Sequence, residues 1–128
     1  MSRGVHEEIR KNIEEIRKSA EEIKQFSRFA LEIKKEVEKA VIEEGYHFVK
    51  CVVRQILDEY QLEIRVSKKG SQKVIYNGSI KSWKEGTGVI YLIEHMLQNK
   101  GIVRYSKEYL LWDHTLVVEF VIKNWVWR

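Results

Sequence analysis

Residues Glu85–Gly101 read EGTGVIYLIEHMLQNKG, and this stretch decides how the second half of the chain folds. Its apolar side chains recur at steps of three and four residues, which is the spacing of a helix with one buried face. Thr87 is the expected N-cap, because its hydroxyl can accept an early backbone N–H, and Gly101 is the expected glycine just past the end. The side chains predicted to be buried are Ile90, Ile93, Met96 and Leu97.

The Gly86-Thr87-Gly88 turn that opens this helix does not have the pattern of a nucleotide-binding loop. Such a loop needs further glycines, usually a lysine, and a buried parallel strand before it. The four histidines are scattered without a metal-ligand spacing, and the acidic residues form no cluster for general acid–base chemistry. We therefore expect no catalytic residue, no metal, no cofactor and no identifiable small-molecule ligand.

Alternating apolar and polar residues before the helix predict a small antiparallel sheet. The pair Asn77-Gly78 is a strong turn signal at the end of the second strand. The valine-rich stretch after the helix, residues 115–127, favours a strand, with a helix as the alternative. The strands expected before the helix are Gln61–Ser67, Gln72–Tyr76 and Ser79–Trp83.

Residues Tyr46–Tyr60 are expected to form a second core helix with a wide apolar face. His47 and Cys51 are four positions apart and would be neighbours on that helix. A cysteine nucleophile needs a base and an orienting group, and no orienting group can be named here. Because Cys51 lies among apolar residues, we expect a buried structural thiol.

Residues Val5–Glu44 carry a narrow apolar stripe with a spacing near that of a coiled coil. A helix of this length would extend about 60 Å, too far for its own domain to cover. A second copy of the chain is the favoured cover, and the alternatives are a fold-back near Gln25–Arg28, a helix that packs on its own domain for half its length, or a partner helix from another protein. The residues expected to mediate oligomerisation are Ile9, Ile13, Ile16, Ile23, Ala30 and Val37.

These elements together predict an α+β protein with a long N-terminal helix or helical hairpin, followed by a small antiparallel sheet with one packed helix. Residues 1–45 would form a coiled-coil oligomerisation segment and residues 46–128 an α+β domain. No apolar run is long enough to cross a bilayer, and the single cysteine fits a reducing compartment. We therefore expect a cytoplasmic protein without membrane contact. Its richness in charged and β-branched residues predicts a thermophilic source.

Positive charge is concentrated in the second half of the chain. Residues 1–60 hold 12 Lys and Arg against 13 Asp and Glu, a balance of −1, whereas residues 61–128 hold 11 against 6, a balance of +5. An anionic partner would dock on this half, although lysines along strands also block aggregation between sheet edges. The candidate nucleic-acid-binding residues are Lys68, Lys69, Lys81, Lys84, Lys107, Lys123 and Arg128.

The run LIEHMLQNKGIVRYSKEYLLWD resembles the winged-helix DNA-binding domains of response regulators. In that family a hydrophobic helix ends near a glycine, as at Gly101, and a short strand like Ile102–Arg104 follows. A motif like Ser106–Leu111 then opens the next helix. The resemblance covers residues 61–128, without a receiver domain or a wing, and implies a recognition helix over Thr115–Arg128.

The leading hypothesis is a small, non-enzymatic nucleic-acid-binding protein that forms a homodimer and binds DNA or RNA. The winged-helix resemblance implies transcriptional regulation. The alternative hypothesis is a protein–protein interaction or scaffold protein that acts through the long N-terminal helix. An enzyme is the least favoured class, because no residue pattern specifies a reaction.

Overall fold

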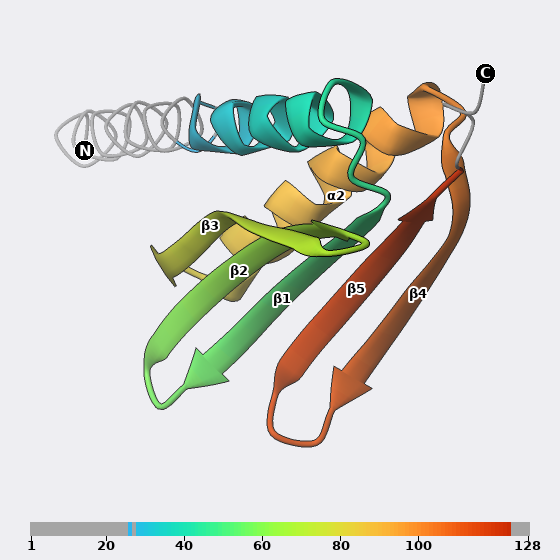
Figure 1. Ribbon diagram of the computed structural model, residues 1–128. Coiled ribbons are helices and arrows are strands. Elements are labelled where there is room, and N and C mark those ends of the chain that lie inside the picture. The colour runs from blue at the N-terminus through green and yellow to red at the C-terminus, as the bar shows by residue number, and fades with distance from the viewer. Residues whose placement is uncertain (1–25, 27, 124–128) are drawn as a thin grey trace, which may run out of the picture.

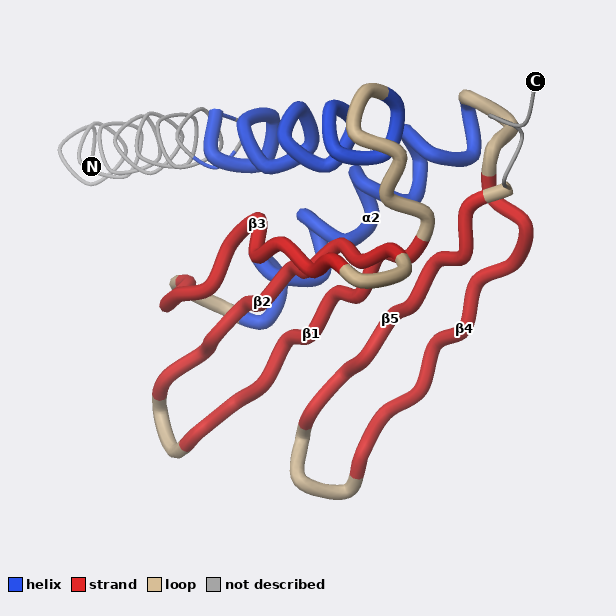
Figure 2. Tube along the Cα trace, viewed as in Figure 1, coloured by secondary structure: helices blue, strands red, loops and turns tan. Residues whose placement is uncertain are grey.

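The computed structural model describes residue 26 and residues 28–123, which form two helices and a five-stranded antiparallel sheet (Figure 1). Both helices lie on the same face of the sheet (Figure 2). The first helix is described over residues 28–42. The other elements are β1 (Phe48–Ile56), β2 (Glu59–Lys68), β3 (Ser71–Ile80), α2 (Trp83–Asn99), β4 (Val103–Leu111) and β5 (Thr115–Ile122).

The strand order across the sheet is β3-β2-β1-β5-β4, and every neighbouring pair is antiparallel. Strand β1 is central because it pairs with β2 on one side and with β5 on the other. Cys51, in the middle of β1, lies opposite Ile64 of β2 and Val118 of β5. Strands β3 and β4 are therefore the two edges of the sheet.

The expectation of a helix over Tyr46–Tyr60 is wrong, because this segment contains β1. Val49, Cys51 and Val53 alternate along the strand and are fully buried beneath the helices. Val52 is also buried, on the opposite face of the sheet, at 5% exposure. Apolar residues on both faces of a central strand resemble the wide apolar face of a helix, and this explains the error.

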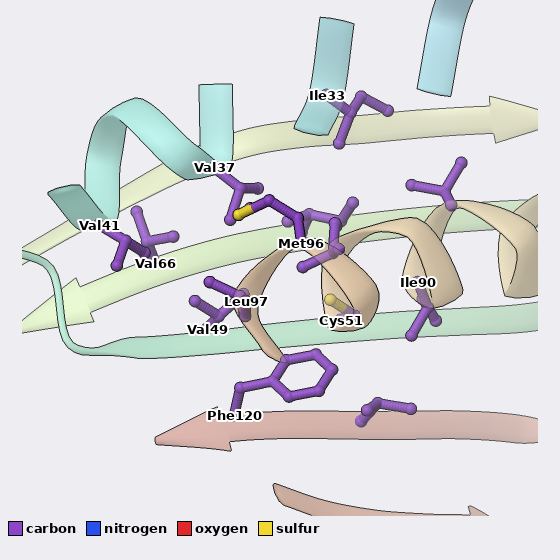
Figure 3. Close-up of a cluster of buried hydrophobic side chains, with 14 of the residues drawn as sticks. Ile33, Val37, Val41, Val49, Cys51, Val66, Ile90, Met96, Leu97 and Phe120 are labelled. Atoms are coloured by element: carbon purple, nitrogen blue, oxygen red, sulfur yellow. The ribbon is translucent and has the colours of Figure 1, made fainter. Parts of the chain in front are cut away.

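The core lies between the sheet and the two helices (Figure 3). Helix 28–42 contributes one row of apolar side chains, and α2, which also contacts β1, β2 and β3, contributes a second. Residues before and after residue 45, where we expected a domain boundary, therefore contribute to the same hydrophobic core. The core side chains that Figure 3 labels are Ile33, Val37, Val41, Val49, Cys51, Val66, Ile90, Met96, Leu97 and Phe120.

Helix α2 begins five residues earlier than the sequence indicates. Ser82 is the N-cap, and its Oγ accepts a hydrogen bond from the backbone N–H of Glu85 at 3.1 Å. Thr87 lies inside the helix, where its hydroxyl donates to the carbonyl oxygen of Lys84 at 3.2 Å. Gly101 follows the last turn at φ 66°, the left-handed conformation that favours glycine, as expected.

The expected fold class is also corrected. Strands dominate the described chain, and the sheet has five strands, whereas we expected a long N-terminal helix followed by a small sheet. Residues 115–122 form β5, which agrees with the favoured strand interpretation of that stretch. Much of the long helix expected over residues 5–44 lies outside the described residues, and the described part, residues 28–42, packs on its own domain.

Candidate interaction surface

The structure spreads the predicted nucleic-acid-binding lysines over the fold. Lys68 and Lys69 lie at the β2–β3 turn, and Lys123, just after β5, is at the same end of the sheet. Lys81 and Lys84 flank the start of α2 at the opposite end, because Ile80 pairs with Tyr60 near the start of β2. The length of β2 separates the two ends by about 30 Å at about 3.3 Å per residue. Lys107 is in the middle of edge strand β4, and Arg128 lies outside the described residues.

Lys68 also has a structural role. Its ammonium donates to the carbonyl oxygen of Glu44 at 2.5 Å and lies 4.5 Å from the ring centroid of Tyr46. Lys73 forms an ion pair with the carboxylate of Glu44 at 3.2 Å. These contacts fix the loop that joins the first helix to β1, and they leave Lys68 less free to bind an anion.

Only two of the predicted oligomerisation residues lie within the described chain. Ala30 and Val37 are 0% exposed and pack in the core of their own domain, so they are not available for contact between subunits. The other four, Ile9, Ile13, Ile16 and Ile23, lie outside the described residues.

Cys51 is buried as expected, although on a strand. Complete burial disfavours the thiolate and raises the pKa of the Cys51 thiol to about 12, so the group stays protonated at neutral pH. Within the described residues there is no group of three or more His, Cys, Asp and Glu side chains that could hold a metal ion.

Exposed apolar side chains gather at one end of the sheet, where the β1–β2 and β4–β5 turns lie side by side (Figure 1). Thr115 of β5 pairs with Arg54 of β1 and with Leu111 of β4, and the backbone N–H of Gln55 donates to the carbonyl oxygen of His114 at 3.3 Å. We call the apolar residues at this end the tip surface, and their exposures are Ile56 48%, Leu57 89%, Leu110 67%, Leu111 42% and Trp112 95%.

Single exposed apolar residues are ordinary, but a cluster on adjacent turns and strand ends is characteristic of an interaction site. Backbone strain supports the same interpretation. Leu57 has φ 57° and His114 has φ 61°, and they are the only positive-φ residues other than glycine in the described chain. A left-handed conformation costs a non-glycine residue roughly 1–2 kcal/mol. At Leu57 the strained backbone carries a leucine side chain that is almost completely exposed. Neither the strain nor the exposed leucine contributes to the stability of the folded domain, so both are consistent with a role in binding.

Both turns of the tip surface carry exposed acidic side chains, and the exposed basic residues Arg54 and Lys81 lie at the same end of the sheet. Asp58 follows Leu57 in the first turn and Asp113 follows Trp112 in the second, and both aspartates are exposed. Glu59 is the first residue of β2, and Glu108 lies three residues before the end of β4. Negative charge in the two turns that carry Leu57 and Trp112 favours a partner with apolar and basic residues.

The sequence interpretation did not identify the tip surface. It grouped Trp112 with nearby lysines and assigned Ile56 and Leu57 to the buried face of the helix expected over Tyr46–Tyr60. It assigned Leu110 and Leu111 to the motif that resembles the start of a winged-helix helix. One local signal was present: a tryptophan followed by Asp113 and His114 lies between two alternating stretches, where a polar turn is the norm. The other hairpin turn could not be found without knowing that residues 48–56 form a strand.

Comparison of the chain with protein-family models, curated proteins and solved structures finds no match in any of the three. The winged-helix resemblance implied helices over Ser106–Leu111 and Thr115–Arg128. The structure has β4 and β5 over the described parts of these segments. Neither described helix combines the length and apolar character needed to span a membrane.

Proposed function

We propose that the protein is a non-enzymatic protein-binding module whose tip surface docks an apolar, basic segment of a partner protein. The observation that carries this proposal is the position of Trp112 and Leu57, 95% and 89% exposed, on two adjacent hairpin turns. This proposal retains the alternative hypothesis of an interaction protein but moves the contact from the N-terminal helix to the sheet end.

The apolar side chains of the tip surface can supply much of the free energy that binding of a partner needs. Burying an exposed leucine such as Leu57 or Leu110 contributes about 1.5–3 kcal/mol. An aromatic side chain buries about 150–250 Å², so Trp112 contributes about 4–6 kcal/mol at about 25 cal/mol per Å². These gross values are comparable with the cost of association, about 4–15 kcal/mol, so binding also depends on polar contacts at the border of the surface.

The charges around the tip surface select the class of partner. Asp58 and Asp113 would repel a phosphate backbone but would attract Lys or Arg side chains beside an apolar anchor. Tryptophan is the residue most often found at the energetic centre of a protein interface. We therefore expect Trp112 to be the main anchor and the two aspartates to set the charge preference.

The test is a fluorescence-anisotropy titration with amphipathic peptides that share one apolar pattern and differ in net charge. We expect the positively charged peptides to bind most tightly and Trp112→Ala to weaken that binding by about 30-fold, or about 2 kcal/mol. The matched control is Tyr91→Ala, which removes an aromatic residue that is 66% exposed on α2, away from the tip surface. Equal losses in the two variants, or no preference for positive peptides, would contradict the proposal.

Nucleic-acid binding is the second candidate, and the +5 balance of residues 61–128 favours it. Lys69 and Lys123, which are exposed at one end of the sheet, are the best placed groups for it. Titration of DNA and RNA fragments at several salt concentrations tests this candidate. Binding that weakens with salt, is lost in Lys69→Glu/Lys123→Glu and is unchanged in Trp112→Ala would select nucleic acid over protein.

A further inference from the structure

Strand β4 forms an open edge of the sheet. It is nine residues long, Val103–Leu111, and within the described chain it pairs only with β5. Arg104 to Glu108 are all exposed, and Tyr105 is 56% exposed. An edge of this length presents unpaired backbone N–H and C=O groups to which another strand can add.

The opposite edge, β3, is more protected. A register shift does not distinguish the two edges, because the β2–β3 pair has one at Ile64 and Arg65 and the β4–β5 pair has one between Val103 and Tyr105. The contacts of β3 with the first helix and its loop do distinguish them. The ring of Phe29, from the first helix, lies edge-on against Tyr76 of β3 with 5.0 Å between centroids. Lys73 of β3 is tied to Glu44. Strand addition is therefore more favourable at β4.

The side chains of β4 are held in place on one face of the sheet. The hydroxyl of Tyr109 donates to the carboxylate of Glu119 in β5 at 3.0 Å. The ammonium of Lys107 lies 5.4 Å from the centroid of the Tyr109 ring. These contacts order the edge before any partner arrives, which lowers the entropy cost of binding.

The charges of β4 discriminate between the registers that a second copy could adopt. In an antiparallel pair with a two-fold axis through one residue, positions equally far before and after that residue lie opposite each other. An axis through Lys107 would place lysine opposite lysine, and an axis through Glu108 would place glutamate opposite glutamate. Like charges directly opposite are destabilising.

An axis through Ser106 gives the complementary arrangement. Arg104 lies at the register shift of the β4–β5 pair, so it comes to within about one residue of Glu108 of the second copy, and the symmetry repeats this pair on the other side of the axis. Tyr105 lies opposite Lys107 of the second copy, a pairing of an aromatic ring with a cation. Axes through Tyr105 or Tyr109 leave the charged residues opposite uncharged ones, so they offer no such compensation.

We propose that two copies of this chain join through their β4 edges, antiparallel and centred on Ser106, to form one continuous ten-stranded sheet. The charged side chains of β4 disfavour the registers centred on Lys107 and Glu108 and favour the register centred on Ser106. The paired segment, Val103–Tyr109, leaves Trp112 outside it, so the dimer keeps both tip surfaces available. The inference is thus independent of the protein-binding role proposed above.

Sedimentation velocity of the full chain tests the interface with Arg104→Glu, Glu108→Arg and the double exchange. We expect a dimer at about 100 μM protein, a dissociation constant raised by about tenfold or more in each single variant, and recovery in the double variant. Circular dichroism establishes that each variant is folded. The proposal would be overturned by a monomeric wild type or by a double variant that stays monomeric. It would also be overturned by single variants that dimerise normally, which is the result expected if the copies met through the N-terminal stripe instead.

A second test uses a disulfide across the two-fold axis. Ser106→Cys places two thiols directly opposite each other, within the Cα separation that a disulfide requires. The matched control is Ser79→Cys, which is exposed on the β3 edge, and Cys51 is too deeply buried to interfere. We expect rapid covalent dimerisation of Ser106→Cys only. Comparable cross-linking of Ser79→Cys, or none at Ser106→Cys, would overturn the proposed register.

Discussion

Replacing Gly86 by alanine tests how closely α2 packs on the sheet. Gly86 is buried in the first half of α2. A Cβ at this position would lie 2.7 Å from Ile80 Cδ1 and 2.9 Å from both Val53 Cγ1 and Val53 Cγ2. Contacts this short force side chains or the helix to move, and overpacking of a core costs about 1–3 kcal/mol.

Helix propensity acts in the opposite direction. Alanine is favoured over glycine in a helix by about 0.8–1.0 kcal/mol. The net expectation for Gly86→Ala is a loss of about 1 kcal/mol in the free energy of unfolding, which lowers Tm by about 3–5 °C for a chain of this size. Urea denaturation followed by circular dichroism measures it. Lys84→Ala, at an exposed position in the first turn of α2, is the control and should change stability by less than about 0.5 kcal/mol.

The cause can be isolated with a double-mutant cycle. Val53→Ala removes two of the three atoms that a Cβ at Gly86 would meet. The third, Ile80 Cδ1, is the end of a flexible side chain that can turn into the space left by Val53, so in that background Gly86→Ala should be neutral or stabilising by up to about 1 kcal/mol. The two substitutions should therefore be coupled. If Gly86→Ala stabilised both backgrounds equally, α2 would not lie as close to β1 as the structure shows.

Two further predictions concern Cys51 and Leu57. Burial raises the pKa of the Cys51 thiol from 9.0 to about 12, so its contribution to stability is present below pH 9 and is lost as the pH rises towards 12. The decline of unfolding free energy between about pH 9 and pH 12 should therefore be shallower in Cys51→Ala, and an identical decline would contradict this cause. Leu57→Asn should raise stability by up to about 1 kcal/mol, because asparagine tolerates φ 57° better than leucine, and should weaken peptide binding. Unchanged binding in that variant would remove Leu57 from the docking site.

Local signals determined several elements of this protein. The steps of three and four in residues 85–97 and the glycine at 101 predicted α2 and its end, because a helix is built from contacts within a few residues. Alternation indicated β2 and the first part of β3. The turn expected at Asn77-Gly78 and the separate strand expected over Ser79–Trp83 are wrong, because β3 continues through that pair to Ile80 and α2 begins at Trp83. The apolar surroundings of Cys51 predicted a buried thiol. In each case neighbouring residues carry the information.

Only the tertiary structure determined the rest. Residues 48–56 are a strand because they lie between β2 and β5, and Val52 pairs with Val117, a residue far away in the sequence. The same pairing brings together the two hairpin turns that carry Leu57 and Trp112, and disperses the lysines to both ends of the sheet. A periodicity reports which side chains are apolar, whereas contacts between distant strands decide which of them stay exposed. Helix 28–42 shows the same limit, because its apolar stripe predicts burial but does not specify that its own domain provides the cover.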